Sequence, residues 1–477
     1  MTSDSPSPGS FRDETDILIA KFQDALTEAL HTADERIALP PRADEILAGL
    51  KEPLPEDGCG IADTLDQLLE LNRKAGANTG GPRCFHFVIG GSTPAAHAAD
   101  LMATAFESLA YTWITSPVGV ELELQGLQWL RELIGLPSNW PGIMVTGGTM
   151  ANLVCLATAR QWWAEELGVD VYKTGMSNLP PMPVLTSGYV HASARKVFGL
   201  LGVGTDQIQV HSKDDVGRLD PESFSNALEV LDGQPAIVVV NAGEVNAGDF
   251  DPVEEMIDLA HQHNTWIHVD GAFGLFARVS PRTEHLVRGV ERADSAAVDG
   301  HKWLNVPYDS GFAFVRDRDL LAKSFRYSAD YLPASDDPKP TLGAIGPESS
   351  RRARGFAVWA TLKAYGRHGH QRIVEHCLDL AQHLARRVEQ VDDLELMAEV
   401  PLNIVAFRYN PGGRSESELD QINQKLGAAV LTDGRFLVGT SKIGRRTVFR
   451  PAFSNWRTRA KDVDEFINVI LNLGYRI

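Results

Sequence analysis

The sequence predicts an α/β protein built on a central, mostly parallel sheet that is flanked by helices. From about residue 94, short apolar runs rich in β-branched residues alternate with helical patterns, which is the order expected of repeated βαβ units. Near residue 350 this alternation stops, and a long helical stretch begins that is followed by a smaller α+β segment. We therefore divide the chain into an N-terminal helical segment (1–93), a large domain (94–367) and a small C-terminal domain (368–477).

The individual elements follow from local periodicity. The predicted strands of the sheet are 142–146, 182–187, 236–241, 265–270, 295–299 and 311–315. The predicted helices between and after them are 149–167, 192–201, 252–263, 351–392 and 461–473, with strands near 403–409 and 446–453 in the small domain. Two amphipathic helices, 11–35 and 62–74, precede the sheet. They cannot bury their apolar stripes alone, so we expect them to pack on the rest of the chain or on a second subunit.

Composition limits the classes of function. The chain has 477 residues, of which 43% are hydrophobic, so it can bury a large core. With 45 Lys and Arg against 63 Asp and Glu, its net charge of −18 disfavours nucleic-acid binding. Its four cysteines form no CxxC pair, and we expect no bound metal. No apolar run is long enough to span a membrane, and MTSDSPSPGS does not resemble a signal peptide, so we expect a cytoplasmic protein.

Two motifs place reactive side chains at the ends of neighbouring strands. HVDGAFG (268–274) puts Asp270 at the carboxyl end of one strand, and DGHKWLN (299–305) delivers Lys302 to the same edge of the sheet. Pyridoxal phosphate needs such a pair, because a lysine amine forms a Schiff base with the cofactor aldehyde and a carboxylate keeps the pyridine nitrogen protonated.

A third motif supplies a cradle for the cofactor's phosphate. In VTGGTMANL (145–153) a strand ends, Gly147 and Gly148 allow close approach of the backbone, and a helix begins near Thr149. The free N–H groups and the dipole at a helix N-terminus bind phosphate. The spacing is not GxGxxG, so the dinucleotide-binding fingerprint is absent.

Six motifs occur in the order found in one family: SPVGVELE (116–123), TGGTMANL (146–153), VHASARKVFGLLG (190–202), HVDGA (268–272), DGHKWL (299–304) and SRRARGF (350–356). With these motifs the chain resembles the group II pyridoxal-phosphate-dependent amino-acid decarboxylases, the group of aromatic-L-amino-acid and glutamate decarboxylases. The resemblance extends from about residue 82 to the C-terminus. It implies a type I aminotransferase-like fold and an intertwined homodimer in which the N-terminal helices wrap the partner.

The resemblance also implies roles for individual residues. Lys302 would form the Schiff base, Asp270 would hold the pyridine nitrogen, and His191 would stack on the ring. Further cofactor contacts would be Gly147, Gly148, Thr149, Ala272, Ser295 and His301. Phe87, Trp113 and Arg354 lie in segments that border the substrate pocket in relatives. The implied reaction is decarboxylation of an L-amino acid to the amine through the Lys302 Schiff base and a quinonoid intermediate.

Two departures from the family leave alternatives open. The stretch 336–350 contains no tyrosine where relatives carry a proton-donating one; Leu342 aligns nearest to it, and Tyr331 belongs to a different position. Without that tyrosine the product could be an aldehyde, unless His191 or another tyrosine supplies the proton. At 242–248 the sequence AGEVNAG replaces a threonine-rich turn, where Glu244 or Asn246 would have to substitute.

The substrate follows less directly from the sequence. CFHFVIGGST (84–93) and YTW (111–113) are aromatic and have one basic neighbour, Arg83, which favours an aromatic or apolar amino acid over glutamate. Three other readings remain: a decarboxylating aldehyde synthase, a carbon–carbon lyase of the same fold, and a non-catalytic protein that only binds the cofactor.

Overall fold

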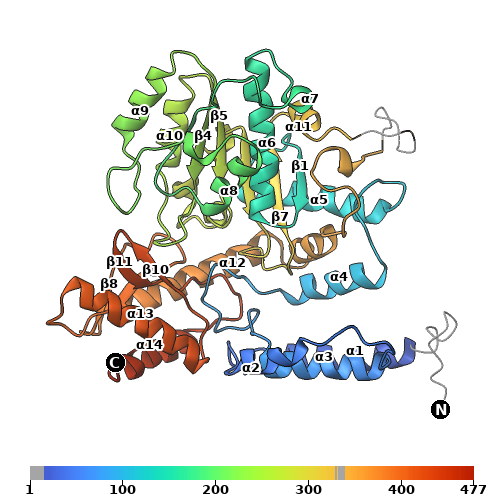
Figure 1. Cartoon of the computed structure of the whole chain (residues 1–477), viewed down its shortest axis with the longest axis vertical. Coiled ribbons are helices and arrows are strands. Elements are labelled where there is room, and N and C mark those ends of the chain that lie inside the picture. The colour runs from blue at the N-terminus through green and yellow to red at the C-terminus, as the bar shows by residue number, and fades with distance from the viewer. Residues whose placement is uncertain (1–14, 328–329, 331–338) are drawn as a thin grey trace.

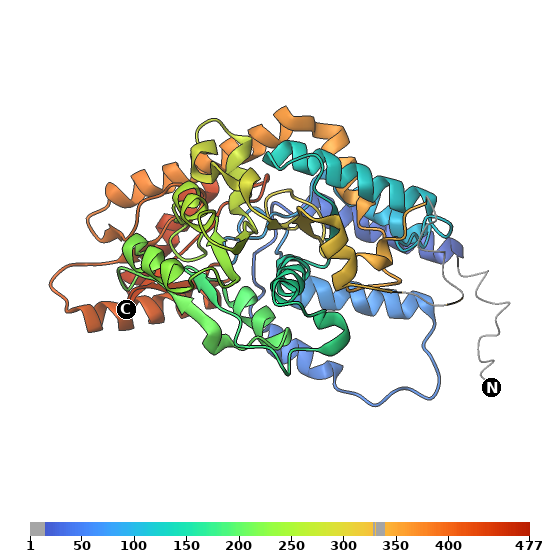
Figure 2. The ribbon, with the colours of Figure 1, turned by 90° about the horizontal axis from the view of Figure 1, so that it is seen from above.

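A seven-stranded sheet forms the centre of the molecule and carries helices on both faces (Figures 1 and 2). The structure is a computed structural model that describes residues 15–327, 330 and 339–477. The strand order is β1-β7-β6-β5-β4-β2-β3, and only β7 runs against the others. The strands are β1 (Gly142–Val145), β2 (Val184–Thr186), β3 (Ile208–Val210), β4 (Ala236–Asn241), β5 (Thr265–Asp270), β6 (Ser295–Asp299) and β7 (Gly311–Val315). The predicted α/β class with a mostly parallel sheet is therefore confirmed.

The helices alternate with these strands, as the sequence predicts. The longer helices that pack on or beside the sheet are α4 (Pro94–Ala105), α5 (Pro117–Ile134), α6 (Gly148–Glu166), α8 (Ala192–Leu200), α9 (Pro221–Val230), α10 (Val253–Ala260), α11 (Arg318–Ser324) and α12 (Gly355–Glu389). Strands β4 and β6 are buried along their whole length, because helices cover both faces of the sheet. Their central residues are accordingly all apolar, with polar side chains only at the strand ends.

The chain ends in a second, smaller layer. A four-stranded antiparallel sheet, in the order β10-β11-β9-β8, packs against two helices. These elements are β8 (Leu394–Leu396), β9 (Phe407–Tyr409), α13 (Glu416–Asp433), β10 (Thr440–Ile443), β11 (Arg446–Phe449) and α14 (Ala460–Gly474). Helix α12 runs between the large and small sheets and is kinked at Gly366, where φ is 59°. The division of the chain at 93 and 367 stays a prediction.

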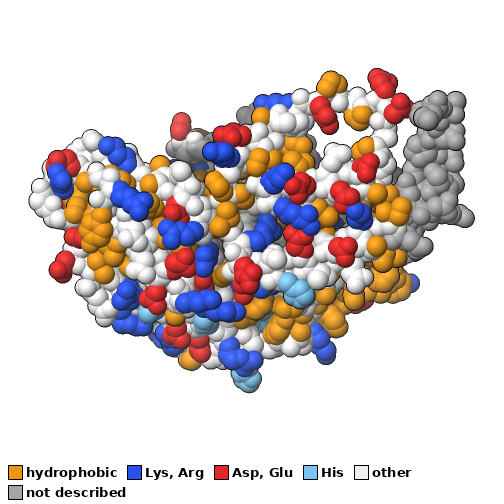
Figure 3. Space-filling model, turned by 90° about the horizontal axis from the view of Figure 1, so that it is seen from below, with side chains coloured by type: hydrophobic (Ala, Val, Ile, Leu, Met, Phe, Trp, Pro, Cys, Tyr) orange, Lys and Arg blue, Asp and Glu red, His pale blue; other side chains and the backbone are white. Residues whose placement is uncertain are grey.

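The N-terminal helices lie along one edge of the molecule (Figure 1). They are α1 (Thr15–Thr32), the short α2 (Ala43–Leu47) and α3 (Ile61–Ala75). Helix α1 packs on α3, yet Ile19, Phe22 and Leu68 remain exposed. Apolar side chains gather on the face of the molecule seen from below (Figure 3). The apolar stripes of α1 and α3 are therefore only partly covered within this chain.

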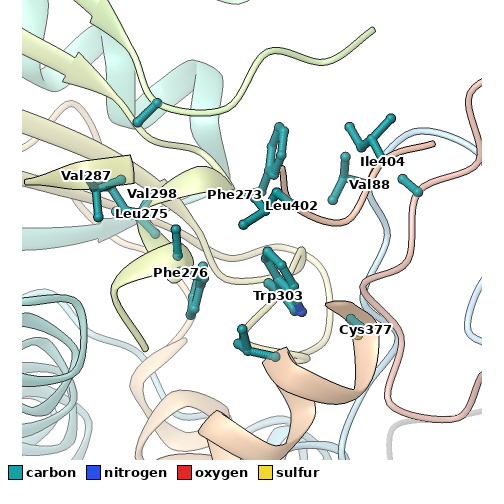
Figure 4. Close-up of a cluster of buried hydrophobic side chains, with 14 of the residues drawn as sticks. Val88, Phe273, Leu275, Phe276, Val287, Val298, Trp303, Cys377, Leu402 and Ile404 are labelled. Atoms are coloured by element: carbon teal, nitrogen blue, oxygen red, sulfur yellow. The ribbon is translucent and has the colours of Figure 1, made fainter. Parts of the chain in front are cut away.

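A cluster of buried side chains fixes the segment that follows β6. Trp303 lies among Phe276, Cys377 and Leu402, which come from the 3-10 segment after β5, from α12 and from the loop between β8 and β9 (Figure 4). Its ring centroid is 6.5 Å from that of Phe276, and only 1% of its surface is exposed. Because Trp303 directly follows Lys302, this packing determines where the lysine backbone lies.

Candidate active site

One pocket collects most of the residues that the sequence singles out. It has a volume of about 340 Å³, within the range of small-molecule sites, and opens at the carboxyl ends of β4, β5 and β6. Of the predicted cofactor contacts, Gly147, Gly148, Thr149, His191, Asp270, Ala272, His301 and Lys302 line it. Tyr189, Asn241, Val245, Phe273 and Tyr308 also contribute to its wall.

Lys302 projects into this pocket from a tightly held loop. Its Nζ lies 3.1 Å from Oδ2 of the buried Asp299 and 5.7 Å from the ring centroid of Phe273. The amide of Asn305 donates hydrogen bonds to the carbonyls of Lys302, at 3.0 Å, and of Ser454, at 2.8 Å. The loop is thus tied to the small domain behind it.

Asp270 ends β5 and is almost fully buried. Its Oδ2 accepts a hydrogen bond of 2.9 Å from the side-chain amide of Asn152, on the second turn of α6. Its Oδ1 receives a longer bond, 3.4 Å, from the backbone N–H of Ala272. Asp270 therefore keeps acceptor capacity toward the pocket, as a carboxylate that faces a pyridinium must.

His191 stands at the N-cap of α8, where its Nδ1 accepts the backbone N–H of Ser193 at 3.2 Å. Desolvation lowers the pKa of His191; the charge of Lys302 lowers it further, and Asp270 acts in the opposite direction. The ring is thus neutral at physiological pH. A backbone N–H can only donate, so the ring proton is on Nε2.

The turn before α6 has no room for side chains. A Cβ on Gly148 would lie 2.7 Å from Asp299 Oδ2, and one on Gly147 would lie 2.9 Å from His301 Cε1. Among the described residues, His301 Nδ1 is buried without a hydrogen-bond partner. Together with the free N–H groups at the start of α6, this arrangement fits a phosphate group.

One predicted cofactor contact does not reach the pocket. Ser295 begins β6, four residues before Asp299, and is fully buried. Its hydroxyl accepts a hydrogen bond from Trp266 Nε1 at 3.0 Å and lies 3.0 Å from His268 Nδ1. Ser295 thus belongs to the layer behind the pocket wall.

The three predicted substrate residues also lie outside the pocket of this chain. Arg354 is buried and paired with Asp309, at 2.8 Å, and with Glu348, at 3.2 Å, so two carboxylates already occupy its guanidinium. Trp113 donates its indole N–H to Glu121 at 2.9 Å. Phe87 is largely exposed and its ring lies 3.8 Å from that of His86.

The turn between β4 and α10 replaces the family's threonine-rich turn, and its Glu244 side chain bonds to the backbone of the same turn. Oxygens of Glu244 accept hydrogen bonds from the backbone N–H groups of Asn246, at 2.8 Å, and Ala247, at 2.6 Å. Burial raises the pKa of Glu244. Consequently Val245, and neither Glu244 nor Asn246, faces the pocket.

Arg450 is a charged residue that the sequence did not single out, and its charge acts on His191 in the pocket. It is buried, donates to the carbonyl of Phe87 at 2.9 Å, and has no partner for Nε and Nη2 among the described residues. Burial lowers its pKa to about 10, against the charge of Glu244. In the sequence, Arg450 could have been noticed as a charged residue within the largely apolar stretch RTVFRPAF (446–453).

Leu342, the residue that aligns nearest to the loop tyrosine of the family, does not line the active-site pocket. Leu342 is buried with Ala110, Val120 and Ala353 in a small separate core. Tyr331 and 336–338 lie outside the described residues. In the described part of the chain, no group of three His, Cys, Asp or Glu could hold a metal, and no helix is long and apolar enough to cross a membrane.

Comparison with known proteins agrees with this geometry. Residues 49–410 match the pyridoxal-dependent decarboxylase conserved domain. The chain is 29% identical to an aromatic-L-amino-acid decarboxylase of Bacillus atrophaeus, over 90% of this chain and 88% of that protein. It is 29% identical to the human cysteine sulfinic acid decarboxylase, over 89% of each chain.

The fold is similar to that of solved structures. A rice (Oryza sativa) protein, TDC, solved with PLP and tryptamine, superimposes with a TM-score of 0.89 at 24% identity, over 97% of this chain and 98% of that one. The match to the conserved domain covers well over half of the 477 residues. The chain therefore belongs to the pyridoxal-dependent decarboxylase family and is a pyridoxal-phosphate-dependent amino-acid carboxy-lyase.

Proposed function

We propose that the protein decarboxylates an L-amino acid with an aromatic or apolar side chain and releases the corresponding amine and CO₂. The observation that supports this most is the meeting of Lys302, Asp270 and His191 in one pocket beside the Gly147–Gly148 turn. When bound, pyridoxal phosphate supplies an aldehyde that amines attack and a ring that accepts the electron pair of the broken bond.

Each residue of the pocket then has a defined task. Lys302 would hold the cofactor through its aldehyde, and its amine faces the pocket in which the substrate's amino group would bind. Asp270 holds the proton of the pyridine nitrogen by charge attraction. The N–H groups at the start of α6, with His301, bind the phosphate. His191 lines the pocket and would contact the cofactor ring, with its proton on Nε2.

Two groups in the pocket can hold a proton for the final step, in which Cα is protonated. Nε2 of His191 carries one, and the Tyr308 hydroxyl carries another. Although 57% of Tyr308 is exposed, partial desolvation and the charge of Asp299 raise its pKa to about 12, so it stays protonated at neutral pH. Tyr308 stacks on His301 with a centroid distance of 4.1 Å and lines the pocket. A proton source other than the loop tyrosine favours the amine over the aldehyde.

Tyr308→Phe tests this source directly. We expect the amine to fall by roughly 100-fold, as for loss of a general acid, and any residual turnover to include aldehyde and hydrogen peroxide. His191→Asn should act in the same direction. Unchanged amine formation in both variants would exclude these two residues as donors.

The walls of the pocket support an apolar or aromatic side chain. Phe273, Val245, Met150 and Tyr308 present apolar surface to it. Arg450 supports a second candidate, a substrate with an anionic side chain. The cysteine sulfinic acid decarboxylase relative shows that such an activity occurs in the family.

A screen of the loaded protein against the L-amino acids and cysteine sulfinate separates these candidates. CO₂, amine, aldehyde and hydrogen peroxide should be recorded together. We expect amine from aromatic or apolar substrates without peroxide. Turnover of acidic substrates only, abolished in Arg450→Met, would instead establish the second candidate. Lys302→Ala should lose the visible absorbance band of the bound cofactor, and a retained band would refute the lysine assignment.

We also propose that the chain acts as a homodimer in which α1 and α3 cover a second copy. The exposed apolar side chains of these helices, among them Ile19, Phe22 and Leu68, support this arrangement. Light scattering should give twice the chain mass of 52.1 kDa. A monomer at micromolar concentration would contradict it.

A further inference from the structure

A buried chain of hydrogen bonds runs behind the pocket wall from β5 and β6 to α6. Trp266 Nε1 lies 3.0 Å from Ser295 Oγ, and Ser295 Oγ lies 3.0 Å from His268 Nδ1. His268 Nε2 lies 2.8 Å from Asn152 Oδ1, and Asn152 Nδ2 lies 2.9 Å from Asp270 Oδ2. Trp266, Ser295, His268 and Asn152 are all at most 2% exposed.

The donor and the acceptor of each of these hydrogen bonds can be assigned, starting from Asp270. The Asp270 carboxylate only accepts, so the Asn152 atom facing it is the NH₂ group and the amide oxygen faces His268. That oxygen can only accept, so His268 carries its proton on Nε2. Burial lowers the pKa of His268 to about 4, which leaves the ring neutral, with Nδ1 free to accept the Ser295 hydroxyl.

The same amide reaches a second functional group. Asn152 Nδ2 lies 3.3 Å from Ser193 Oγ, and Ser193 Oγ lies 2.7 Å from His191 Nδ1. Asn152 thus stands at a branch, with Asp270 on one side and the Ser193–His191 pair on the other. It belongs to α6, the helix whose first turn forms the proposed phosphate cradle.

We infer that Asn152, held in one orientation by His268, is a positioning residue that sets the Asp270 carboxylate and the Ser193 hydroxyl beside His191 at the same time. Reversal of the amide would turn its oxygen toward the Asp270 carboxylate and leave the His268 Nε2–H without an acceptor. The Asp270 carboxylate, which can only accept, and the Nε2–H of His268 together oppose that reversal, because the reversed amide would lose both hydrogen bonds. The inference rests on the proposed roles of Asp270 and His191 in holding the cofactor.

Two substitutions of His268 separate positioning from packing. In His268→Gln the side-chain amide reaches the place of Nε2 and can still donate to Asn152. In His268→Asn the shorter amide reaches only the place of Nδ1, beside Ser295. Both variants remove the buried imidazole, so thermal unfolding of the cofactor-free proteins measures the cost in packing that they share.

The main readout is the dissociation constant of pyridoxal phosphate, measured by equilibrium dialysis. We expect His268→Asn and Asn152→Leu to raise it roughly tenfold or more, the effect of one hydrogen bond to a buried charged group, and His268→Gln to raise it less than about threefold. Equal weakening by the Gln and Asn variants, or no weakening by either, would overturn the inference.

A second readout needs no cofactor and does not depend on any variant folding. In the ¹⁵N-histidine-labelled full-length protein, His268 and His191 should both give the signature of the neutral Nε2–H tautomer. A protonated Nδ1 on His268 would overturn the assigned direction of the hydrogen bonds, whereas the Ser193 backbone N–H holds His191 in the Nε2–H tautomer independently of Asn152. If the tautomers agree but Lys302→Ala keeps the visible band, the proposed function fails while the hydrogen-bond chain stands.

Discussion

At the scale of single residues, the pocket depends on Gly148, a position where a larger side chain cannot fit. Gly148 opens α6 against the Asp299 carboxylate, and a methyl group there would lie 2.7 Å from Oδ2. Either Asp299 or the first helical turn would have to move. Because Asp299 also holds Lys302, the displacement would affect both the phosphate cradle and the reactive lysine.

Gly148→Ala should therefore weaken binding of pyridoxal phosphate by roughly tenfold or more, the scale expected for losing a charge-assisted hydrogen bond. Gly199→Ala is the matched control, since that glycine lies inside α8 and an added Cβ there meets no atom within 4 Å. The control should bind normally and gain up to about 1 kcal/mol in stability from helix propensity. Equal cofactor affinity of the two variants would contradict the proposed cradle.

Some residues could be predicted from the sequence because motif and strand end coincide. Asp270 and Lys302 follow short strands, so the parallel sheet brings them together whatever the loops do. Arg450 could not be placed in this way, because its neighbours Phe87 and Glu244 are hundreds of residues distant in the chain. Arg354 lies in a motif of the family, and one carboxylate that pairs with it, Glu348, is six residues away, but Asp309 is 45 residues away and cannot be assigned to it from the local pattern.

At the scale of elements, six of the seven strands of the large sheet were predicted from the sequence, and one edge strand, β3, was not. Strand β4 is an uninterrupted apolar run, since it is buried on both faces. Strand β3 escaped notice because it has three residues and two of them are exposed. The predicted helix over 351–392 starts later, at Gly355, because Arg351 leaves the helical pattern to pair with Glu123 on α5.

That ion pair joins α5, β1 and the start of α12. Both Arg351–Glu123 contacts are 2.7–2.8 Å, the two side chains are at most 1% exposed, and Glu123 Oε1 also accepts the N–H of Met144 at 2.9 Å. Arg351→Met leaves the carboxylate buried without its cation. We expect it to lower the free energy of unfolding by about 3–5 kcal/mol, as read from urea denaturation.

A surface pair provides the comparison. Arg282 and Asp379 are 2.7 Å apart, but both side chains are largely open to solvent. Arg282→Met should cost less than about 1 kcal/mol. Similar losses for the two arginine variants would mean that the Arg351–Glu123 pair does not join these elements.

At the scale of the whole molecule, stability toward acid should depend on histidines that the fold keeps neutral. Burial lowers the pKa of His268, behind the pocket, and of His370, in α12 between the two sheets, to about 4 in each case. In the unfolded chain a histidine takes up its proton near pH 6.5. Between these two values the unfolded state binds more protons than the folded state does.

The free energy of unfolding should therefore be unaffected by these groups above about pH 6.5 and fall as the pH drops toward 4, by up to about 3 kcal/mol for each histidine. His370→Phe removes one of these two buried histidines. His370 lies close to the Gly366 kink and does not line the active-site pocket. Unfolding midpoints measured from about pH 7.5 down to about pH 4.5 should show a shallower acid limb for this variant. A slope in His370→Phe as steep as in the wild type would show that His370 is protonated in the folded protein, and that acid sensitivity arises elsewhere.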